Sequence, residues 1–377
     1  MLALTLLLTL TNCTSTDVAK VQQAINSDDP KKAIAKIVRD KGRTYRENPD
    51  VLIEDMKNLP QLLHNLEVVV RQIWGDKWLL PSRNKYVKYT NGYQSRAEVD
   101  FTKGIVRVET IATNKPLEQL QKAIVVTLLT SEDPSQTDIF SDRTPVIAGK
   151  PYLFGEVLDQ DKQPIAYSWR ANRFADYLVA NELGQGKVGR KNSYFVEIQM
   201  VGNHGELRKQ KYADIVLAAA GKYQVAPDLI YAIIETESSF NPFAVSSANA
   251  YGLMQVIPAT AGKDVYDKVM NKPGMPTRDV LFQVEDNIHI GTAYLHLLQT
   301  RYLAKVNSGL RRHYSVISAY NGGAGNVAKT FSSNRERAWL LINQSSAAQV
   351  YQKLTQSHPK AESRRYLEKV IKAQKKY

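Results

Sequence analysis

The segment Asp228–Pro242, which reads DLIYAIIETESSFNP, combines an apolar helical pattern with two glutamates near its end. From Ile230 to Glu237, the positions of one face follow one another at spacings of three, one and three residues, which is helical periodicity. Glu237 therefore belongs to the apolar face, at the C-terminal end of the predicted helix. Glu235 lies two positions earlier, roughly 200° around the helix, and we expect it to be a surface residue that faces water.

A carboxyl on the inward face near the end of a helix is predicted to retain its proton. Burial raises the pKa of a carboxyl, and the carbonyl end of the helix dipole raises it further. A glutamate that is protonated at neutral pH can act as a general acid. The alternative is a structural role, because one salt bridge with an Arg or Lys also places a carboxylate in a protein interior. The helix by itself leaves both interpretations open.

Two glycine-containing segments follow the predicted helix. In Ala250–Gln255, which reads AYGLMQ, the glycine lets the backbone approach a ligand closely, while Gln255 and Met254 offer a polar and an apolar wall. Ala319–Gly325, which reads AYNGGAG, comes at the end of another apolar helical segment. Its tyrosine and asparagine can stack on a sugar and hydrogen-bond to its amides and hydroxyls. Each segment taken alone is equally typical of a helix C-cap.

Taken in order, four elements resemble the motifs of the soluble-type lytic murein transglycosylases, a family whose catalytic domain has the goose-type lysozyme fold. The resemblance covers roughly residues 207–377, and its motifs are specific as a set. The preceding α+β segment, including YVKYTNGYQSRAEVDF at residues 86–101, resembles a membrane-bound subgroup of that family. The four elements are Glu237-Ser238, GLMQ at 252–255, AYNGG at 319–323, and Tyr366 within AESRRYLEKV.

The resemblance implies cleavage of the β-1,4 bond between N-acetylmuramic acid and N-acetylglucosamine in peptidoglycan, which leaves 1,6-anhydromuramyl ends. A single glutamate, Glu237, would act first as acid and then as base. By family position, Ser246 would help to hold the surroundings of the acetamido group or of the carboxyl, and Tyr366 would bond near the catalytic carboxylate. The remaining implied substrate-binding residues are Met254, which would pack under the sugar, and Gln255, Tyr320 and Asn321, which would line the subsites.

Two other functions stay open at this point. A lysozyme-type muramidase would use water and would need a second carboxylate, for which Asp264, Glu285 and Asp286 are candidates, although each occupies a position typical of a solvated helix start. A non-catalytic peptidoglycan-binding lipoprotein is the other alternative, and an intact Glu237 argues against it. The absence of a convincing partner for Glu237 in the sequence favours the transglycosylase.

The charge balance favours an anionic partner without identifying it. The chain has 377 residues, and 50 Lys and Arg against 37 Asp and Glu give a formal net charge of +13. We expect no nucleic-acid partner, because the aromatic residues do not interleave with Lys and Arg as a stacking platform requires. The six histidines are scattered, and His289 and His296 have no third ligand nearby in the sequence. We therefore predict no metal and no organic cofactor.

The only cysteine of the chain, Cys13, follows the short apolar run MLALTLLLTLTN. This run is too short to span a bilayer as a helix and is typical of an export signal. The stretch Leu10–Cys13 resembles the bacterial lipobox, which predicts a lipid anchor on Cys13 and a location at the periplasmic face of the bacterial outer membrane.

The predicted fold is an α+β N-terminal domain followed by an all-α, lysozyme-like catalytic domain. Alternating apolar residues and Asn-Gly and Lys-Gly turns predict an antiparallel meander, and helical periodicity dominates the sequence from about residue 207 onward, where we expect no strand. Predicted strands cover 86–90, 95–101, 104–112, 151–159, 164–169 and 193–201, and predicted helices cover 117–130 and 174–183. The predicted divisions are a signal peptide at 1–12, a helical segment at 13–75, an α+β accessory domain at 76–202 and the catalytic domain at 203–377.

Overall fold

A computed structural model describes residues 59–307 and 309–377. The chain divides into two compact units between Leu80 and Pro81. The predicted signal peptide, the predicted lipidation site Cys13 and most of the helical segment predicted at 13–75 lie outside the described residues. The predicted boundary at 202/203 falls inside the second unit, so the α+β region and the helical region that follows it belong to one compact body.

The described part of the first unit contains helix α4, Leu59–Trp74, and a short 3-10 turn, Gly75–Lys77. Apolar residues of α4 recur at helical spacing, as the periodicity before residue 75 predicts. Within residues 59–307 and 309–377, we find no helix that is both long and apolar enough to cross a bilayer.

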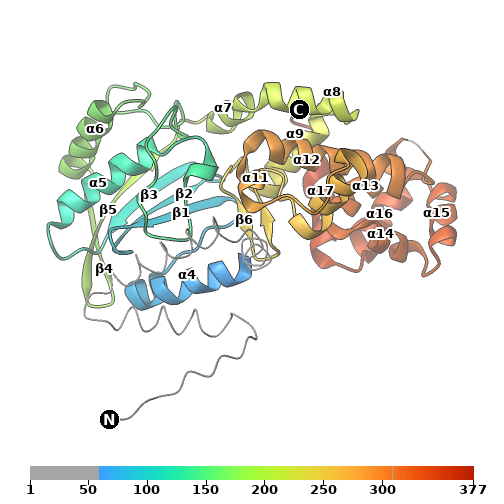
Figure 1. Cartoon of the computed structure of the whole chain (residues 1–377), viewed down its shortest axis with the longest axis horizontal. Helices are drawn as coiled ribbons and strands as arrows, with labels where there is room; N and C mark the ends of the chain where they lie inside the picture. The colour runs from blue at the N-terminus through green and yellow to red at the C-terminus, as the bar shows by residue number, and fades with distance from the viewer. Residues whose placement is uncertain (1–58, 308) are drawn as a thin grey trace, which may run out of the picture. The chain divides into compact units, whose positions relative to one another are not determined.

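A five-stranded antiparallel sheet forms the centre of the α+β region (Figure 1). The predicted meander is confirmed, because the first three strands pair in sequence order with the register Tyr86↔Val99 and Val99↔Val106. The strand order across the sheet is β1-β2-β3-β5-β4. The strands are β1 (Lys85–Thr90), β2 (Ser95–Asp100), β3 (Ile105–Thr110), β4 (Gly184–Val188) and β5 (Lys191–Gln199).

One helix packs on a face of this sheet, and a second helix packs on the first. Helix α5, Pro116–Leu129, packs on β2, β3 and β5, and α6, Ser168–Asn181, packs on α5, as the side-by-side ribbons in Figure 1 show. The buried residues of α5 include Leu120, Ile124 and Leu128, which recur every four residues and form the face turned to the sheet. The predicted α+β architecture is confirmed.

The strands predicted at 151–159 and 164–169 are wrong. The first stretch folds into tight turns, in which the Phe154 amide donates to the Pro151 carbonyl and the Glu156 amide to the Leu153 carbonyl. Only isolated bridges occur there, and Ser168 already begins α6. Most apolar residues of 151–159, such as Tyr152, Leu153 and Val157, are buried as parts of a loop, whereas Phe154 is exposed. Burial in this stretch therefore does not require pairing in a sheet. Conversely, β4 was not predicted because Gly184 and Gly186 weaken the strand signal.

The region from residue 204 onward is helical, as predicted, with one exception. The exception is a two-stranded hairpin, β6 (Val245–Ser246) and β7 (Ala250–Tyr251), which corrects the expectation of no strand. Each strand has two residues, too few for a periodic signal. The helices are α7 (His204–Lys211), α8 (Ala213–Tyr223), α9 (Pro227–Ser238), α10 (Lys263–Val265), α11 (Arg278–Phe282), α12 (Val284–Leu297), α13 (Leu310–Gly322), α14 (Ala324–Phe331), α15 (Arg335–Gln344), α16 (Ala347–Ser357) and α17 (Ala361–Gln374), with π-helical turns at Pro258–Gly262, Tyr266–Met270 and Leu298–Tyr302.

Aromatic side chains join the α+β region to the helical region. Phe243, just beyond α9, packs against Tyr86 of β1 at 4.7 Å and against Tyr152 at 5.2 Å between ring centroids. Tyr86 and Tyr152 are in turn 5.4 Å apart. All three rings are buried. This shared core fixes the start of β1 relative to the end of α9, which is where the candidate site lies.

Candidate active site

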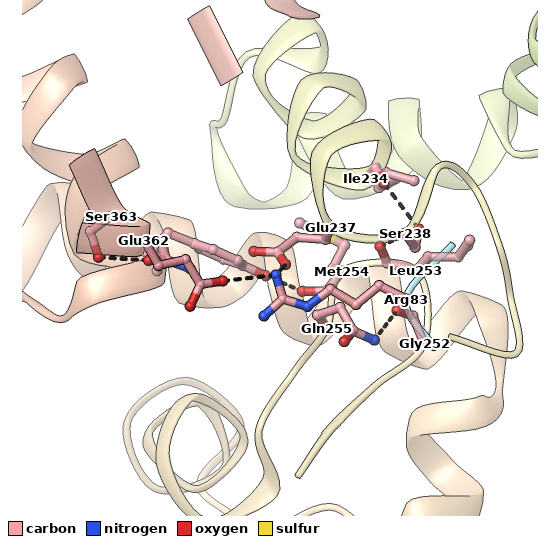
Figure 2. A network of polar contacts seen from close by, with 12 residues as sticks. Arg83, Ile234, Glu237, Ser238, Gly252, Leu253, Met254, Gln255, Glu362 and Ser363 are labelled. Carbon is pink, nitrogen blue, oxygen red and sulfur yellow. Dashed lines mark hydrogen bonds and ion pairs between the residues drawn. The ribbon is translucent and has the colours of Figure 1, made fainter. Parts of the chain in front are cut away.

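Helix α9 places Glu237 in the interior, as its periodicity predicts. Glu237 is 4% exposed and lies one residue before the end of the helix. The helix ends because Ser239 and Phe240 adopt left-handed backbone conformations, with φ of 52° and 61°. The Ser238 hydroxyl donates to the Ile234 carbonyl at 3.0 Å and to the Leu253 carbonyl at 2.8 Å (Figure 2). This last turn is therefore fastened to the loop that follows β7, and the backbone of Glu237 is held firmly.

Burial raises the pKa of Glu237 to about 7 and is the largest influence on it. The Arg83 guanidinium and the Tyr366 hydroxyl lower this pKa, and the Glu362 carboxylate raises it. Nη1 of Arg83 lies 3.9 Å from Oε2 of Glu237, which is beyond hydrogen-bond distance. Glu237 therefore exchanges its proton close to neutral pH, as a group that both donates and accepts a proton requires.

Glu235 is not the simple surface residue that we expected. Its carboxylate accepts hydrogen bonds from the Tyr377 hydroxyl at 2.6 Å and from the Lys376 ammonium group, and its side chain is 26% exposed. Periodicity correctly separates it from Glu237, but the C-terminal residues of the chain cover it. Glu235 is therefore a structural link between α9 and the residues after α17.

The loop after β7 is built around a glycine. Gly252 has φ of +71°, and a Cβ there would lie 2.3 Å from Nδ2 of Asn287 and 2.7 Å from the Leu281 carbonyl oxygen, so no larger residue fits without movement. Asn287 is 1% exposed; its amide donates to the Tyr251 and Leu281 carbonyls, and its oxygen accepts from the Met254 amide. Asn287 was not predicted as a residue of the site, because an asparagine within an apolar helix has no distinctive signal in the sequence.

Met254 and Gln255 are more deeply buried than side chains that form the open walls of a ligand site. Met254 is fully buried, and its sulfur lies against Gly291, so its side chain belongs to the core. Gln255 is 7% exposed, has φ of 48° and donates its amide to the Gly252 carbonyl at 3.1 Å. Within the described residues, the Gln255 side-chain oxygen has no hydrogen-bond partner.

The end of α13 and the first turns of α17 supply the remaining predicted residues. The Tyr320 hydroxyl donates to the Met254 carbonyl at 2.8 Å, and the charge of Glu237 helps to raise the pKa of Tyr320 above its usual value, second to burial. Asn321 accepts a hydrogen bond of 2.6 Å from Ser363 of α17. Tyr366 is 3% exposed, and its hydroxyl has no fully formed hydrogen bond to any described residue, although it interacts with the Glu237 carboxyl. The structure thus brings Tyr320 and Tyr366 to Glu237.

Ser246 lies on β6 and is partly exposed, while its hydroxyl oxygen is buried. That oxygen has no hydrogen-bond partner in the part of the chain that the structure describes. A buried hydroxyl without a partner is uncommon in folded proteins, and it marks Ser246 as a position that can accept or donate a hydrogen bond to a ligand.

The three carboxylates suggested as second catalytic groups lie in other surroundings. Asp264 accepts from Lys268 and from the Tyr302 hydroxyl, and Glu285 and Asp286 lie in the first turn of α12. In contrast, Glu362 of α17 pairs with Arg83 at 3.0 Å and is close enough to raise the pKa of Glu237.

Neither Arg83 nor Glu362 was among the residues predicted from the sequence. Glu362 had a usable signal, because it lies four residues before Tyr366 and so on the same face of a helix. Arg83 had none, since it comes from a different region of the chain.

The described residues contain no cluster of three His, Cys, Asp or Glu side chains that could hold a metal ion. His296 interacts through Nδ1 with the Tyr223 carbonyl at 2.8 Å, and His289 packs edge-on against the Tyr223 ring. Both rings therefore take part in packing around α8.

Two family profiles match the chain. The profile described as membrane-bound lytic murein transglycosylase C, N-terminal domain, covers residues 52–211, and the profile described as transglycosylase SLT domain covers residues 214–342.

Known relatives match over most of the chain. The membrane-bound lytic murein transglycosylase C of Yersinia pestis (strain Pestoides F) is 45% identical over 330 residues, which cover 87% of this chain and 92% of the relative. The protein of the same name from Yersinia pseudotuberculosis serotype O:1b (strain IP 31758) has the same values. Among solved structures, the lytic transglycosylase Slt from Pseudomonas aeruginosa is 25% identical with a TM-score of 0.32, covering 43% of this chain and 23% of that chain. A TM-score this low supports no inference about function.

Proposed function

Because the chain belongs to the membrane-bound lytic murein transglycosylase C family and is a lytic transglycosylase, a lyase that acts on peptidoglycan, we propose that Glu237 is its single catalytic acid and base. The observation that carries this proposal is a buried carboxyl at the end of α9 with a pKa raised to about 7. Among the residues that the structure describes, no cation lies at hydrogen-bond distance from it.

The reaction proceeds in two steps within the glycan strand. Protonated Glu237 donates its proton to the oxygen of the β-1,4 bond between N-acetylmuramic acid and N-acetylglucosamine, the bond from C1 breaks, and the 2-acetamido group stabilises the positive centre at C1. The Glu237 carboxylate then takes the proton of the C6 hydroxyl while O6 bonds to C1. The product is a 1,6-anhydromuramic acid end, and no water is consumed.

The same proposal gives roles to the surrounding residues. Ser246 and Gln255 each offer a buried polar oxygen without a partner among the described residues, and we assign them to hydrogen bonds with the substrate. Tyr320 and Asn321 line the subsites, and Tyr366 stabilises the Glu237 carboxylate. Met254 supports the site from the protein interior. Its side chain is buried in the core, and its backbone carbonyl accepts the hydrogen bond that holds Tyr320.

We also propose the remaining organisation of the protein. Residues 76–202 form the accessory domain and residues 203–377 the catalytic domain. Cleavage after the signal peptide at 1–12 exposes Cys13, whose lipid anchor holds the protein at the periplasmic face of the outer membrane in cell-wall remodelling. A Cys13→Ala variant should move from the membrane fraction to the soluble fraction; if it stays membrane-bound, the anchor is elsewhere.

Mass spectrometry of sacculus digests tests the reaction. Wild-type protein should release anhydromuropeptides, which are lighter than hydrolysed muropeptides by the mass of one water molecule, and Glu237→Gln should release them about a thousandfold more slowly. Hydrolysed ends from the wild type would instead support the muramidase, for which Glu362 would then be the first candidate second carboxylate. Unchanged cleavage by Glu237→Gln would overturn the catalytic assignment, and no cleavage by either protein would support the non-catalytic binding lipoprotein.

A further inference from the structure

Arg83 reaches the Glu237 carboxyl from the α+β region, just before β1. We propose that Arg83 is a positioning residue of the active site, which orients the Glu237 carboxyl and balances its charge while Glu362 holds the guanidinium in place. The inference rests on the proposed role of Glu237, and it gives the α+β region, through Arg83, a role in catalysis.

The backbone of Arg83 is attached directly to the segment that follows α9. The Asn241 side-chain amide donates to the carbonyls of Ser82 and Arg83, at 3.4 and 3.1 Å. Asn241 is fully buried, and its side-chain oxygen accepts from the Phe243 amide at 3.0 Å. One asparagine therefore holds both the chain after Glu237 and the backbone from which the Arg83 side chain extends.

Further contacts fasten the same junction. Arg208 of α7 donates to the Phe101 carbonyl at 3.2 Å and to the Ser239 carbonyl at 2.9 Å, so it bridges the chain after β2 to the residues just beyond Glu237. The hydroxyls of Thr102 and Ser239 are 3.2 Å apart. Together with the tilted, closely packed rings of Phe243 and Tyr86, these contacts leave the Arg83 backbone little freedom to move relative to Glu237.

The guanidinium lies between two carboxylates of different character (Figure 2). Nη1 of Arg83 forms a 3.0 Å hydrogen bond with Oε1 of Glu362 and lies 3.9 Å from Oε2 of Glu237. The Glu362 side chain is 59% exposed and that of Glu237 only 5%. The short bond to Glu362 anchors the arginine, and the longer contact lets its charge act on Glu237 while leaving the Glu237 oxygens available for proton transfer.

This arrangement suits both steps of an acid–base reaction. When Glu237 gives up its proton, a negative charge forms in a buried site, and an uncompensated buried charge is costly. Arg83 compensates that charge without a change of its own, because a guanidinium stays protonated throughout the working pH range. The longer contact also keeps the carboxylate basic enough to take the proton back.

Within the described part of the chain, four titratable groups face Glu237 from the elements around it. They are Arg83 from the loop before β1, Glu362 and Tyr366 from α17, and Tyr320 from α13, while the loop after β7 contributes the uncharged Gln255. Arg83 lowers the pKa of Glu237, and Glu362 raises it. Removing these two charges should therefore shift the titration of Glu237 in opposite directions.

The test is the pH dependence of kcat/KM on soluble glycan strands for Arg83→Met, Arg83→Lys and Glu362→Gln. A general acid works while protonated, so activity falls as pH rises through its pKa. Arg83→Met should move this alkaline limb to higher pH by about one unit and should lower kcat more than it changes KM. Arg83→Lys keeps the charge and should move the limb less. Glu362→Gln should move the limb to lower pH.

Arg173→Met serves as the matched control, because Arg173 forms an exposed ion pair with Asp161 on the α+β region and does not face Glu237. It should leave the limb where it is, and thermal melting of all variants establishes that they are folded. The inference is overturned if Arg83→Met and Glu362→Gln move the limb in the same direction or not at all, or if Arg83→Met changes KM alone. Retained cleavage by Glu237→Gln would instead overturn the proposed function, so the two failures are distinguishable.

Discussion

The α+β region and the helical region each bury a glutamate under nearly the same conditions. Glu156 is 3% exposed and Glu237 is 4% exposed, and burial raises the pKa of both to about 7. Their cation partners differ. Nε of Arg208 lies 2.8 Å from Glu156, whereas Nη1 of Arg83 lies 3.9 Å from Glu237.

The comparison shows that burial and a raised pKa do not by themselves identify a catalytic carboxyl. Both the Arg208 and Glu156 side chains are buried, and Arg208 also donates to two backbone carbonyls, so this pair belongs to the structural junction. The arginine next to Glu237 is partly exposed and lies beyond hydrogen-bond distance. Ser246, Gln255 and Tyr366 belong to the same proposed site as Glu237. The difference lies in the pairing, because the close arginine contact engages a Glu156 oxygen, whereas the longer contact leaves the Glu237 oxygens available for proton transfer.

The largest effect should come from Glu237→Gln. Because it removes the proposed acid and base, cleavage of soluble glycan strands should fall about a thousandfold, while the free energy of unfolding should not decrease. The control is Glu156→Gln, which should retain wild-type activity per folded molecule. Equal loss of activity in both variants would remove the distinction between the two glutamates.

Breaking the Arg208–Glu156 pair should cost stability instead of activity. Arg208→Met leaves Glu156 buried without its cation, and the free energy of unfolding in urea should fall by about 4 kcal/mol. Arg83→Met is the matched comparison, because the Arg83 side chain is 37% exposed. This variant should lower the free energy of unfolding by less than about 1 kcal/mol. Similar losses in the two variants would contradict the structural difference between the pairs.

The raised pKa of Glu237 should also appear in the pH dependence of stability. Between the usual carboxyl pKa of 4.5 in the unfolded chain and about 7 in the folded protein, the folded state binds more protons. Glu237 therefore favours folding at low pH, and this contribution is lost as pH rises towards 7. Relative to the wild type, Glu237→Gln should gain about 3 kcal/mol between pH 4.5 and pH 8. A constant difference between the two urea denaturation series would mean that Glu237 titrates as in the unfolded chain.

A smaller effect is expected from the hydroxyl next to Glu237. Tyr366→Phe removes a group that lowers the pKa of Glu237, so the alkaline limb of activity should move to higher pH. Because the Glu237 carboxylate formed in the first step then lacks its stabilising hydroxyl, activity at neutral pH should fall about fivefold, or about 1 kcal/mol. Tyr377→Phe removes the corresponding hydroxyl from Glu235 and should leave the pH profile unchanged. A shift with Tyr377→Phe but not with Tyr366→Phe would reverse the roles inferred for the two glutamates.

Much of the fold could be predicted because its signals are local. The three-strand meander follows from alternating residues and an Asn-Gly turn, and α5 and α9 follow from helical spacing. The strand predicted at 151–159 was wrong, because a buried loop and a buried strand share an apolar composition and differ only in their hydrogen-bond partners. The hairpin of β6 and β7 is too short to have a period.

The candidate site could be predicted only in part. The inward position of Glu237 follows from its place on α9, and the motifs around Gly252 and Tyr320 are recognisable as a set. Glu235 shows the limit of prediction from a local pattern. The predicted exposure of Glu235 holds for an isolated helix, but in the folded protein Tyr377, distant in the sequence, covers its carboxylate.

The order of residues in α9 is enough to specify which glutamate faces inward, since a helical period of 3.6 residues separates Glu235 from Glu237 without reference to any other segment. The surroundings of that carboxyl depend on how distant segments pack together. Arg83 and Glu362 come from regions far apart in the chain, and their charges meet at Glu237 because Asn241, Arg208 and the Phe243 ring fasten the two regions together. Electrostatic interactions depend on distance in space, which no local pattern encodes.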